Sequence, residues 1–272
     1  MIERFKNINA QKLANNIKIY EKSFEHVLPG DRPYVVRLDG VNFKEFTKNL
    51  VKPFDPNFTK ALELTTEALV ERTAATIGYC QSDEITLISG PATEGNAKNH
   101  LYGGRTQKIA SILASFAAVR FNYYLSTLLP DVKTSASKLG LFDARVFSVP
   151  DWETAAEALI WRHRFDCRRN ALHSIAQAHY PPKSIEGQPL KDVIDRLLKE
   201  KQVDAYTAYP SSNVYGTFVK KVQVQIDGKN PKTGEIIPTI RNRIVSKSFD
   251  WTEEVDSESI VKFISDPFFN KL

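Results

Sequence analysis

One stretch of the sequence orders strand-like and helix-like patterns in a way that few folds accommodate. A strand, a helix, a hairpin, a second helix and a strand are predicted in turn over residues 33–39, 56–76, 78–89, 105–128 and 142–150. Asp55 directly precedes Pro56 and is placed to cap the first of these helices. This order is typical of a split β-α-β sheet of the ferredoxin type, with helices covering one face. We therefore predict the α+β class with an antiparallel sheet.

The remainder of the chain adds helices and a final pair of strands. A helix over residues 8–24 is expected to lead into the core. Beyond Pro150 we predict helices over residues 151–157, 165–180 and 189–199, then strands over residues 216–226 and 236–245 joined by a turn at residues 227–231. We accordingly expect a core over residues 1–150 and a C-terminal helical and β-hairpin portion over residues 151–272, packed together as one unit.

The composition excludes several classes of protein. Only two cysteines occur, Cys80 and Cys167, which excludes a disulfide scaffold and indicates a reducing compartment. The first residues are interrupted by charges, unlike a secretory signal, and no stretch holds the roughly 20 apolar residues of a membrane span. We therefore expect a cytoplasmic protein with no membrane partner. The net charge of +5 is compatible with a polyanionic partner and does not require one.

Three carboxylates occupy strand ends that this fold brings together. Asp39 ends the first strand, and Asp83 and Glu84 form the tip of the hairpin, which neighbours that strand in a split β-α-β sheet. Paired aspartates on adjacent strands can hold divalent hard cations, of which magnesium needs the fewest protein ligands. Gly40 lets the chain turn tightly, so that the next amides can cradle a triphosphate. Those amides belong to Val41, Asn42 and Phe43.

The same acids also have a plain structural interpretation. Asp39 can cap a turn, and Asp83 with Glu84 can simply solubilise a hairpin tip, because acidic residues are common in turns.

The Gly-Gly start of the long helix can likewise be interpreted as an anion site or as a plain connection. Arg105 and Lys108 lie one turn apart there and suit an anion such as a phosphate, although a Gly-Gly helix start is more often a plain connection. Spacing alone leaves both choices open.

An arginine cluster lies in the helical part that follows Pro150. Its members are Arg162, Arg164, Arg168 and Arg169, and they surround an aromatic pair, Trp161 and Phe165. Only one acid, Asp166, lies inside the stretch, and this surplus of positive charge favours binding to RNA phosphates. A solvated helix face with local ion pairs is the alternative. The histidines show no zinc-ligand spacing, and Cys80 is best interpreted as a buried structural thiol.

Several of these motifs, in this order, resemble those of the histidine-tRNA guanylyltransferase family. They are Arg37 to Phe46, Lys52 to Asp55, Gln81 to Glu84, Arg105 with Lys108, and Phe142 to Arg145. Together they cover about the first two-thirds of the chain. The resemblance implies a domain similar to the palm of ordinary polymerases that extends RNA in the reverse, 3'-to-5' direction.

The resemblance also implies roles for individual residues. Asp39 and Asp83, with the Gly40 carbonyl, would bind two magnesium ions that Glu84 supports. The triphosphate of the activating nucleotide would contact Gly40, Val41, Asn42, Phe43, Lys44 and Ser82. Its base would contact Lys52 and Asp55, and Arg105 with Lys108 would bind the triphosphate of the incoming nucleotide. The implied reaction uses ATP or another nucleoside triphosphate to activate the 5'-monophosphate of an RNA, and the 3'-hydroxyl of an incoming nucleotide such as GTP then attacks it.

One departure separates the chain from the enzymes that act on histidine tRNA. Those enzymes typically carry a histidine after the Asp-Cys pair, where this chain has Arg168. This resembles the guanylyltransferase-like subgroup, which restores missing 5' nucleotides on truncated tRNAs by Watson-Crick templating. We therefore expect templated 5'-end repair of tRNA by a homotetramer, as in the family. The expected RNA contacts are Arg145, Arg162, Arg164, Arg168, Arg169 and Asn170.

Three other functions remain open at this stage. The nearest is addition of a single guanylate to histidine tRNA, which the same motifs support. Paired carboxylates in a split β-α-β sheet also suit a nucleotide cyclase, which would act without RNA. A non-catalytic RNA-binding module needs only the arginine cluster and the positive net charge.

Overall fold

A six-stranded antiparallel sheet forms the centre of the protein. The computed structural model describes residues 9–92, 100–129, 139–229, 234–251 and 255–269. The strands are β1 (Tyr34–Gly40), β2 (Ile77–Gln81), β3 (Glu84–Ser89), β4 (Phe142–Ser148), β5 (Thr217–Lys229) and β6 (Ile236–Lys247). They are ordered β4-β1-β3-β2-β5-β6, and every neighbouring pair is antiparallel. The α+β class is confirmed, and the pairing of β2 with β5 makes the last two strands part of the same sheet.

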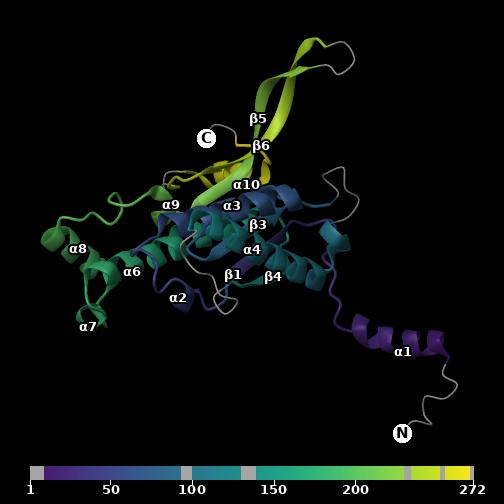
Figure 1. Ribbon diagram of the computed structural model, residues 1–272, viewed down its shortest axis with the longest axis horizontal. Coiled ribbons are helices and arrows are strands. Elements are labelled where there is room, and N and C mark those ends of the chain that lie inside the picture. The colour runs from purple at the N-terminus through teal and green to yellow at the C-terminus, as the bar shows by residue number, and fades with distance from the viewer. Residues whose placement is uncertain (1–8, 93–99, 130–138, 230–233, 252–254, 270–272) are drawn as a thin grey trace, which may run out of the picture.

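Helices pack against the sheet and extend from it (Figure 1). They are α1 (Ala10–Lys22), α2 (Phe43–Phe46), α3 (Pro56–Thr73), α4 (Thr106–Leu128), α5 (Trp152–Ile160), α6 (Arg168–His179), α7 (Pro182–Ile185), α8 (Leu190–Lys201), α9 (Ser211–Val214) and α10 (Ser257–Ser265). A 3-10 helix spans Leu101–Gly104, and a π-helix spans Trp161–Cys167. None of the described helices is both long enough and apolar enough to cross a bilayer.

The sheet carries a hydrophobic core on each of its two faces. On one face, Leu38 and neighbouring strand residues pack against Leu69 of α3 and Phe121 of α4. On the other, Tyr79 and Phe218 pack with α5, α10 and Trp251. The sequence predicted helices on one face only. The second layer was missed because α10 follows the last strand, where a short amphipathic pattern does not indicate which face it covers.

The first helix does not enter the core, contrary to the prediction. No residue of α1 is buried, and Figure 1 shows the helix lying away from the sheet. Its large apolar residues are exposed, for example Ile17 at 50% and Tyr20 at 73%. Loose spacing of apolar residues therefore predicted the helix correctly and its packing wrongly, because periodicity does not show whether a partner surface lies within reach.

The chain between Asp151 and Tyr180 is one continuous helical rod rather than two separate helices. Asp151 caps α5 through its side chain, which accepts from the Thr154 amide, as predicted. The π-helix then joins α5 directly to α6. Neither glycine nor proline occurs here to end a helix, so the helical hydrogen bonding continues through a wider turn. Near the other end of the chain, the turn predicted over residues 227–231 is wrong in its first part, because Asp227, Gly228 and Lys229 belong to β5 and pair with β6. Residues 230 and 231 lie outside the described residues.

Candidate active site

The predicted neighbourhood of the three acids is present at one end of the sheet. Asp39 lies opposite Glu84 on β3 and opposite Asp143 on β4. The Gly40 amide donates to the carbonyl of Asp83 over 3.0 Å, which ties the end of β1 to the β2–β3 turn. Strand register therefore explains why residues far apart in the sequence meet here.

Position 40 requires glycine because its backbone lies too close to Phe43 and Asp83 to leave room for a side chain. A Cβ atom at this position would lie 2.5 Å from the Phe43 ring and 2.9 Å from the Asp83 Cβ. Asn42 follows in a left-handed conformation, with φ of 58°, before α2 begins. The Val41 amide, expected to face a phosphate, instead donates to the Leu141 carbonyl over 2.8 Å. The row of amides suited to a triphosphate therefore reduces to Asn42 and Phe43.

Asp83 carries a carboxylate without a cationic partner. In the part of the chain that the structure describes, no lysine or arginine nitrogen lies within 4 Å of it. Burial raises the pKa of Asp83, and the negative charge of Asp39 raises it further. Two carboxylates that repel each other beside a backbone carbonyl form an oxygen-rich set that suits a divalent hard cation.

Asp39, Asp83 and the Gly40 carbonyl provide fewer protein ligands than most metal sites in proteins have. Among the described residues, no group of three or more His, Cys, Asp or Glu side chains is arranged to hold a metal ion. Magnesium tolerates one or two carboxylates because water and phosphate oxygens complete its shell. Asp39, Asp83 and the Gly40 carbonyl therefore fit magnesium bound together with a phosphate better than a metal held by protein alone.

Glu84 is held differently from the two aspartates. It pairs with Arg37 at 3.0 Å and with Arg162 at 3.1 Å, and it accepts from the Gln81 amide at 3.2 Å. Burial raises the pKa of Glu84 to about 7, although Arg162 and Arg37 act to lower it. With three donors on its carboxylate, Glu84 is suited to position its neighbours.

The arginine cluster is paired within the protein. Arg162 and Arg169 bind Asp166 at 2.8 and 2.7 Å. Arg168 pairs with Asp250 and lies over the Tyr215 ring, and Arg164 donates to the Trp251 carbonyl. Arg145 lies 3.7 Å from Asp143 and 4.0 Å from Asp39. The local surplus of positive charge is therefore smaller than the sequence indicates, because tertiary contacts supply Glu84 and Asp250 from outside the stretch.

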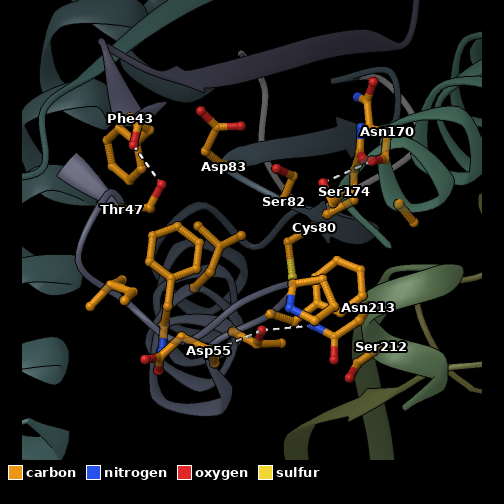
Figure 2. A pocket seen from close by; sticks show the side chains of 18 of the residues that line it. Phe43, Thr47, Asp55, Cys80, Ser82, Asp83, Asn170, Ser174, Ser212 and Asn213 are labelled. Atoms are coloured by element: carbon orange, nitrogen blue, oxygen red, sulfur yellow. Dashed lines mark hydrogen bonds between the residues drawn. The ribbon is translucent and has the colours of Figure 1, made fainter. Parts of the chain in front are cut away.

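A cavity of about 300 Å³ opens beside Asp83. Figure 2 shows Asp83 and Ser82 on one side of it, Asp55 below, and Asn170, Ser174, Ser212 and Asn213 along another wall. Asn170 was predicted to contact RNA, whereas here it lines the cavity. Lys44 and Lys52, predicted nucleotide contacts, also line it. Ser174, Ser212 and Asn213 could not be identified from the sequence, because they belong to no recognisable motif and meet the others only in the fold.

Asp55 has the structural role that the sequence predicted for it. Its Oδ1 accepts from the amides of Asn57 at 2.9 Å and Phe58 at 3.1 Å, capping α3, and its Oδ2 accepts from Val51 at 3.2 Å. Most of the capacity of this carboxylate is thus committed to backbone donors. Lys52 donates to the Thr47 carbonyl at 2.9 Å.

Arg105 and Lys108 are not brought to the cavity. Arg105 pairs with Glu25 at 3.4 Å, and the Thr106 amide donates to the His26 carbonyl. These two groups at the start of α4 are therefore already bonded within the protein. Phe121, near the other end of α4, contacts Phe43. Helical rise places the start of α4 about 24 Å along the axis from Phe121. A nucleotide held at Asp83 and one held at Arg105 would be far apart in one chain.

Two buried thiols and a buried histidine complete the surroundings. Burial raises the pKa of Cys80 and of Cys167 to about 12, so both remain protonated, as expected for a structural Cys80. His163 donates through Nδ1 to the Tyr215 carbonyl at 2.8 Å and accepts from the Trp251 amide at Nε2 over 3.0 Å. Burial lowers the pKa of His163 to about 4. This neutral histidine ties the π-helix to the C-terminal segments.

Comparison with known proteins gives the site a family context. The family model for tRNA(His) guanylyltransferase matches residues 14–150. A bacterial tRNA(His) guanylyltransferase-like protein in complex with ATP is similar in structure, with a TM-score of 0.69 and 30% identity over 76% of this chain and 87% of that one.

Two sequence relatives extend this context. A protein of Acanthamoeba polyphaga mimivirus, named as uncharacterized, is 28% identical over 97% of this chain and 92% of its own length. The tRNA(His) guanylyltransferase of Debaryomyces hansenii is 28% identical over 57% of this chain and 58% of that protein. The family match contains Asp39, Gly40 and Asp83, whereas Asn170 and Asn213 lie beyond it.

Proposed function

The chain belongs to the tRNA(His) guanylyltransferase family of nucleotidyltransferases, and from this premise we propose that it adds nucleotides to the 5' end of tRNA in the 3'-to-5' direction under the guidance of a template. The observation that carries the proposal is the pair Asp39 and Asp83, held by the Gly40 turn beside the cavity. We further propose residues 1–150 as the catalytic core, completed by residues 151–272.

The reaction consists of two displacements at phosphorus. First, an oxygen of the RNA 5'-monophosphate attacks the α-phosphorus of ATP or another nucleoside triphosphate. A new phosphorus–oxygen bond forms, and the bond to pyrophosphate breaks. Second, the 3'-hydroxyl of an incoming nucleotide such as GTP loses its proton and attacks the activated 5'-phosphorus. The nucleoside monophosphate leaves, and the RNA is one nucleotide longer.

Different residues of this chain would bind the metal, contact the triphosphate and position the acidic side chains. Asp39, Asp83 and the Gly40 carbonyl would hold magnesium, which when bound neutralises charge that develops on phosphate oxygens. The Asn42 and Phe43 amides, with Lys44, would contact the triphosphate, and Phe43 and Lys44 line the cavity. Arg37 and Arg162 keep the Glu84 carboxylate in place next to Asp39.

Templated repair is supported over single-guanylate addition by the surroundings of Arg168. Its guanidinium pairs with Asp250 and stacks on Tyr215, so this position serves the fold. Because the Arg168 guanidinium is bonded within the protein, it is a poor candidate for recognising one particular tRNA. Arg145, Arg164 and Arg169 remain the proposed contacts to RNA phosphates, together with Arg162 and Arg168 as their supports. A homotetramer, expected from the family, is part of the proposal and is testable by light scattering.

Extension of truncated tRNAs tests this function. The protein is incubated with magnesium, ATP and all four nucleotides on several 5'-monophosphorylated tRNAs that lack their first nucleotide. We expect each to regain the nucleotide complementary to its partner strand, and tRNAs with an intact 5' end to remain unchanged. Extension of histidine tRNA alone would replace repair by single-guanylate addition. Cyclic nucleotide formed without RNA, or RNA binding without extension, would overturn the proposal altogether.

A further inference from the structure

A second hollow, larger than the cavity beside Asp83, lies where α3 meets α4 and the two hairpin strands β5 and β6. Its volume is about 950 Å³, and we call it the hairpin groove. The helices α3 and α4 pack against each other, and α3 also contacts both strands (Figure 1). In the described part of the chain, none of the predicted site residues lines this groove. Its side chains are therefore free of the roles discussed so far.

Two arginines of the hairpin groove are held on one aromatic ring. The Cζ atoms of Arg72 and Arg120 lie 4.8 and 5.3 Å from the centre of the Phe116 ring. Arg72 also donates to the Tyr102 hydroxyl at 3.2 Å. A guanidinium that lies on a ring keeps the N–H groups at its edge available to an anion, and two such groups beside each other attract negative charge.

The cations of the hairpin groove have no carboxylate partner among the described residues. No Asp or Glu oxygen there lies within 4 Å of the charged nitrogens of the groove's cations, which are Arg72, Arg120, Lys221 and Arg243. Two acids, Glu67 and Glu71, also line the groove, and the Glu67 carboxylate accepts from the Ser246 hydroxyl. Positive charge is therefore in excess and exposed to a ligand.

The contrast with the predicted arginine cluster is direct. In that cluster Arg162 and Arg169 bind Asp166, and Arg168 binds Asp250. The guanidinium groups of Arg72 and Arg120 are supported by a ring instead of an acid, so their charge is not neutralised within the protein. An anionic ligand gains more from such groups than from arginines that are already paired.

The hairpin groove continues from the cavity beside Asp83 along α3. Glu63 lines that cavity, and Glu67, one helical turn further, lines the groove. The Thr217 and Ser246 hydroxyls of the hairpin segment donate to these two acids, which fixes the strands against the same side of α3. From Glu63 to Arg72 the helix rises by about 14 Å. A chain-like ligand a few units long can therefore occupy the cavity and the groove together.

We propose that the hairpin groove binds the phosphate backbone of RNA, with Arg72 and Arg120 on the helical side and Lys221 on the strand side. Phosphate oxygens match the fork of the guanidinium, and backbone contacts of this kind position an RNA without reading its sequence. The inference rests on the proposed function, which brings an RNA 5' end to the cavity from which the groove continues. It adds a phosphate-binding surface outside the arginine cluster.

RNA binding over a range of salt concentrations tests this assignment. The full-length protein, wild type and variant, is mixed with a 5'-monophosphorylated tRNA that lacks its first nucleotide, without nucleoside triphosphates, and binding is measured by filter retention. Arg72→Gln and Arg120→Gln should each weaken binding and lower the slope of log affinity against log salt by about one. The double variant should lower the slope by about two and the affinity by about tenfold or more.

A change of opposite sign sharpens the test. Glu71→Gln removes a negative charge from the groove and should strengthen tRNA binding. Lys191→Gln, on the exposed side of α8 and remote from the groove, is the matched control and should leave affinity and slope unchanged. Thermal unfolding of each variant checks folding.

Several outcomes would overturn the assignment. An unchanged slope in the folded double variant is one, and equal losses in Lys191→Gln are another. Poly-glutamate that binds the wild type as tightly as tRNA, and loses affinity in the double variant, would identify an acidic peptide as the occupant instead. Groove-dependent binding of tRNA without any extension would count against the proposed function alone, whereas extension with full affinity in the double variant would count against the groove alone.

Discussion

Asp83 and Asp166 are both withdrawn from solvent, yet their surroundings are opposite. Asp166 is 6% exposed and accepts from Arg162, Arg169 and Gln81 at 2.8, 2.7 and 3.1 Å. Asp83 has no cation within 4 Å among the described residues, and burial together with the charge of Asp39 raises its pKa. One carboxylate is neutralised by the fold, and the other is left with its charge uncompensated.

The partners of a carboxylate distinguish acidic residues that stabilise the fold from acidic residues that bind a ligand. A buried carboxylate paired with several cationic or amide donors stabilises its neighbours, whereas one kept near another carboxylate without a cationic partner costs stability and implies a ligand. Asp166 belongs to a set of contacts that we call the π-helix latch, formed by Asp166, Arg162, Arg169, His163 and their partners. Substitutions at Asp83 should therefore lower activity, whereas substitutions in the π-helix latch should lower stability.

The largest effect is expected at Asp83. Asp83→Asn keeps the shape of the side chain and removes its charge, so nucleotide addition should fall by about 1,000-fold or more, because phosphate charge then lacks its metal ligand. Removing the repulsion with Asp39 should leave the melting temperature unchanged or slightly raised. Single-turnover extension assays and calorimetry measure the two quantities. Full activity, or a large fall in melting temperature, would contradict the distinction between Asp83 and the latch.

The opposite pattern is expected at Asp166. Asp166→Ala leaves Arg162, Arg169 and Gln81 without their shared acceptor, and the free energy of unfolding should fall by about 3 kcal/mol. Denaturant titration measures the change. Asp192→Ala, on α8, serves as an exposed acidic control with little expected effect. A stable Asp166→Ala protein that has lost only activity would move Asp166 into the catalytic group.

The latch should also make stability depend on pH through His163. The folded protein holds this histidine neutral, with its pKa lowered to about 4 by burial, whereas an unfolded histidine titrates near 6.5. Between these values the unfolded chain binds a proton that the folded chain does not, so stability is lost as the pH falls through this window. The loss attributable to His163 is about 3 kcal/mol.

Unfolding curves at pH 7 and pH 4 test this dependence. His163→Gln should lower stability at pH 7 and reduce the difference between the two pH values by about 3 kcal/mol. His173→Gln changes an exposed histidine and should leave the difference unaltered. An equally steep pH dependence in His163→Gln would show that other groups carry it.

Gly40 offers a smaller effect that involves the catalytic region alone. In Gly40→Ala the added Cβ would meet the Phe43 ring at 2.5 Å and the Asp83 Cβ at 2.9 Å. Relief of this contact must shift the turn, at a cost of about 1–3 kcal/mol, and nucleotide addition should fall with it. Gly30→Ala is the matched control, because nothing lies within 4 Å of its new Cβ. Equal activity of both variants would show that the turn is not constrained.

The smallest effect is expected from Arg169, which is 55% exposed and joins the latch only at its edge. Arg169→Ala should weaken tRNA binding modestly and lower the slope of log affinity against log salt by about one. Filter binding over a range of salt concentrations measures this slope. An unchanged slope would assign Arg169 to the ion pair with Asp166 only.

Local patterns predicted much of the fold. The strand, helix, hairpin, helix, strand order, the Asp55 cap and the meeting of Asp39 with the hairpin tip are confirmed, because periodicity, capping and strand pairing are short-range or topological properties. The cavity wall formed by α6 and α9 was predicted only in part. Asn170 was expected to contact RNA, whereas Ser174, Ser212 and Asn213 belong to no motif and meet the other cavity residues only in the fold.

The class of chemistry was predictable from the sequence, because its motifs resemble those of a nucleotidyltransferase family and place two aspartates at neighbouring strand ends beside a glycine turn. Which charged side chains are available to a ligand depends on contacts between residues that are distant in the sequence. The fold pairs the arginine cluster with Asp166, Glu84 and Asp250 and holds the Val41 amide against the Leu141 carbonyl. Among the described residues it leaves Asp83 without a cationic partner. Charges act over distances in space, and a linear pattern shows only the neighbours along the chain.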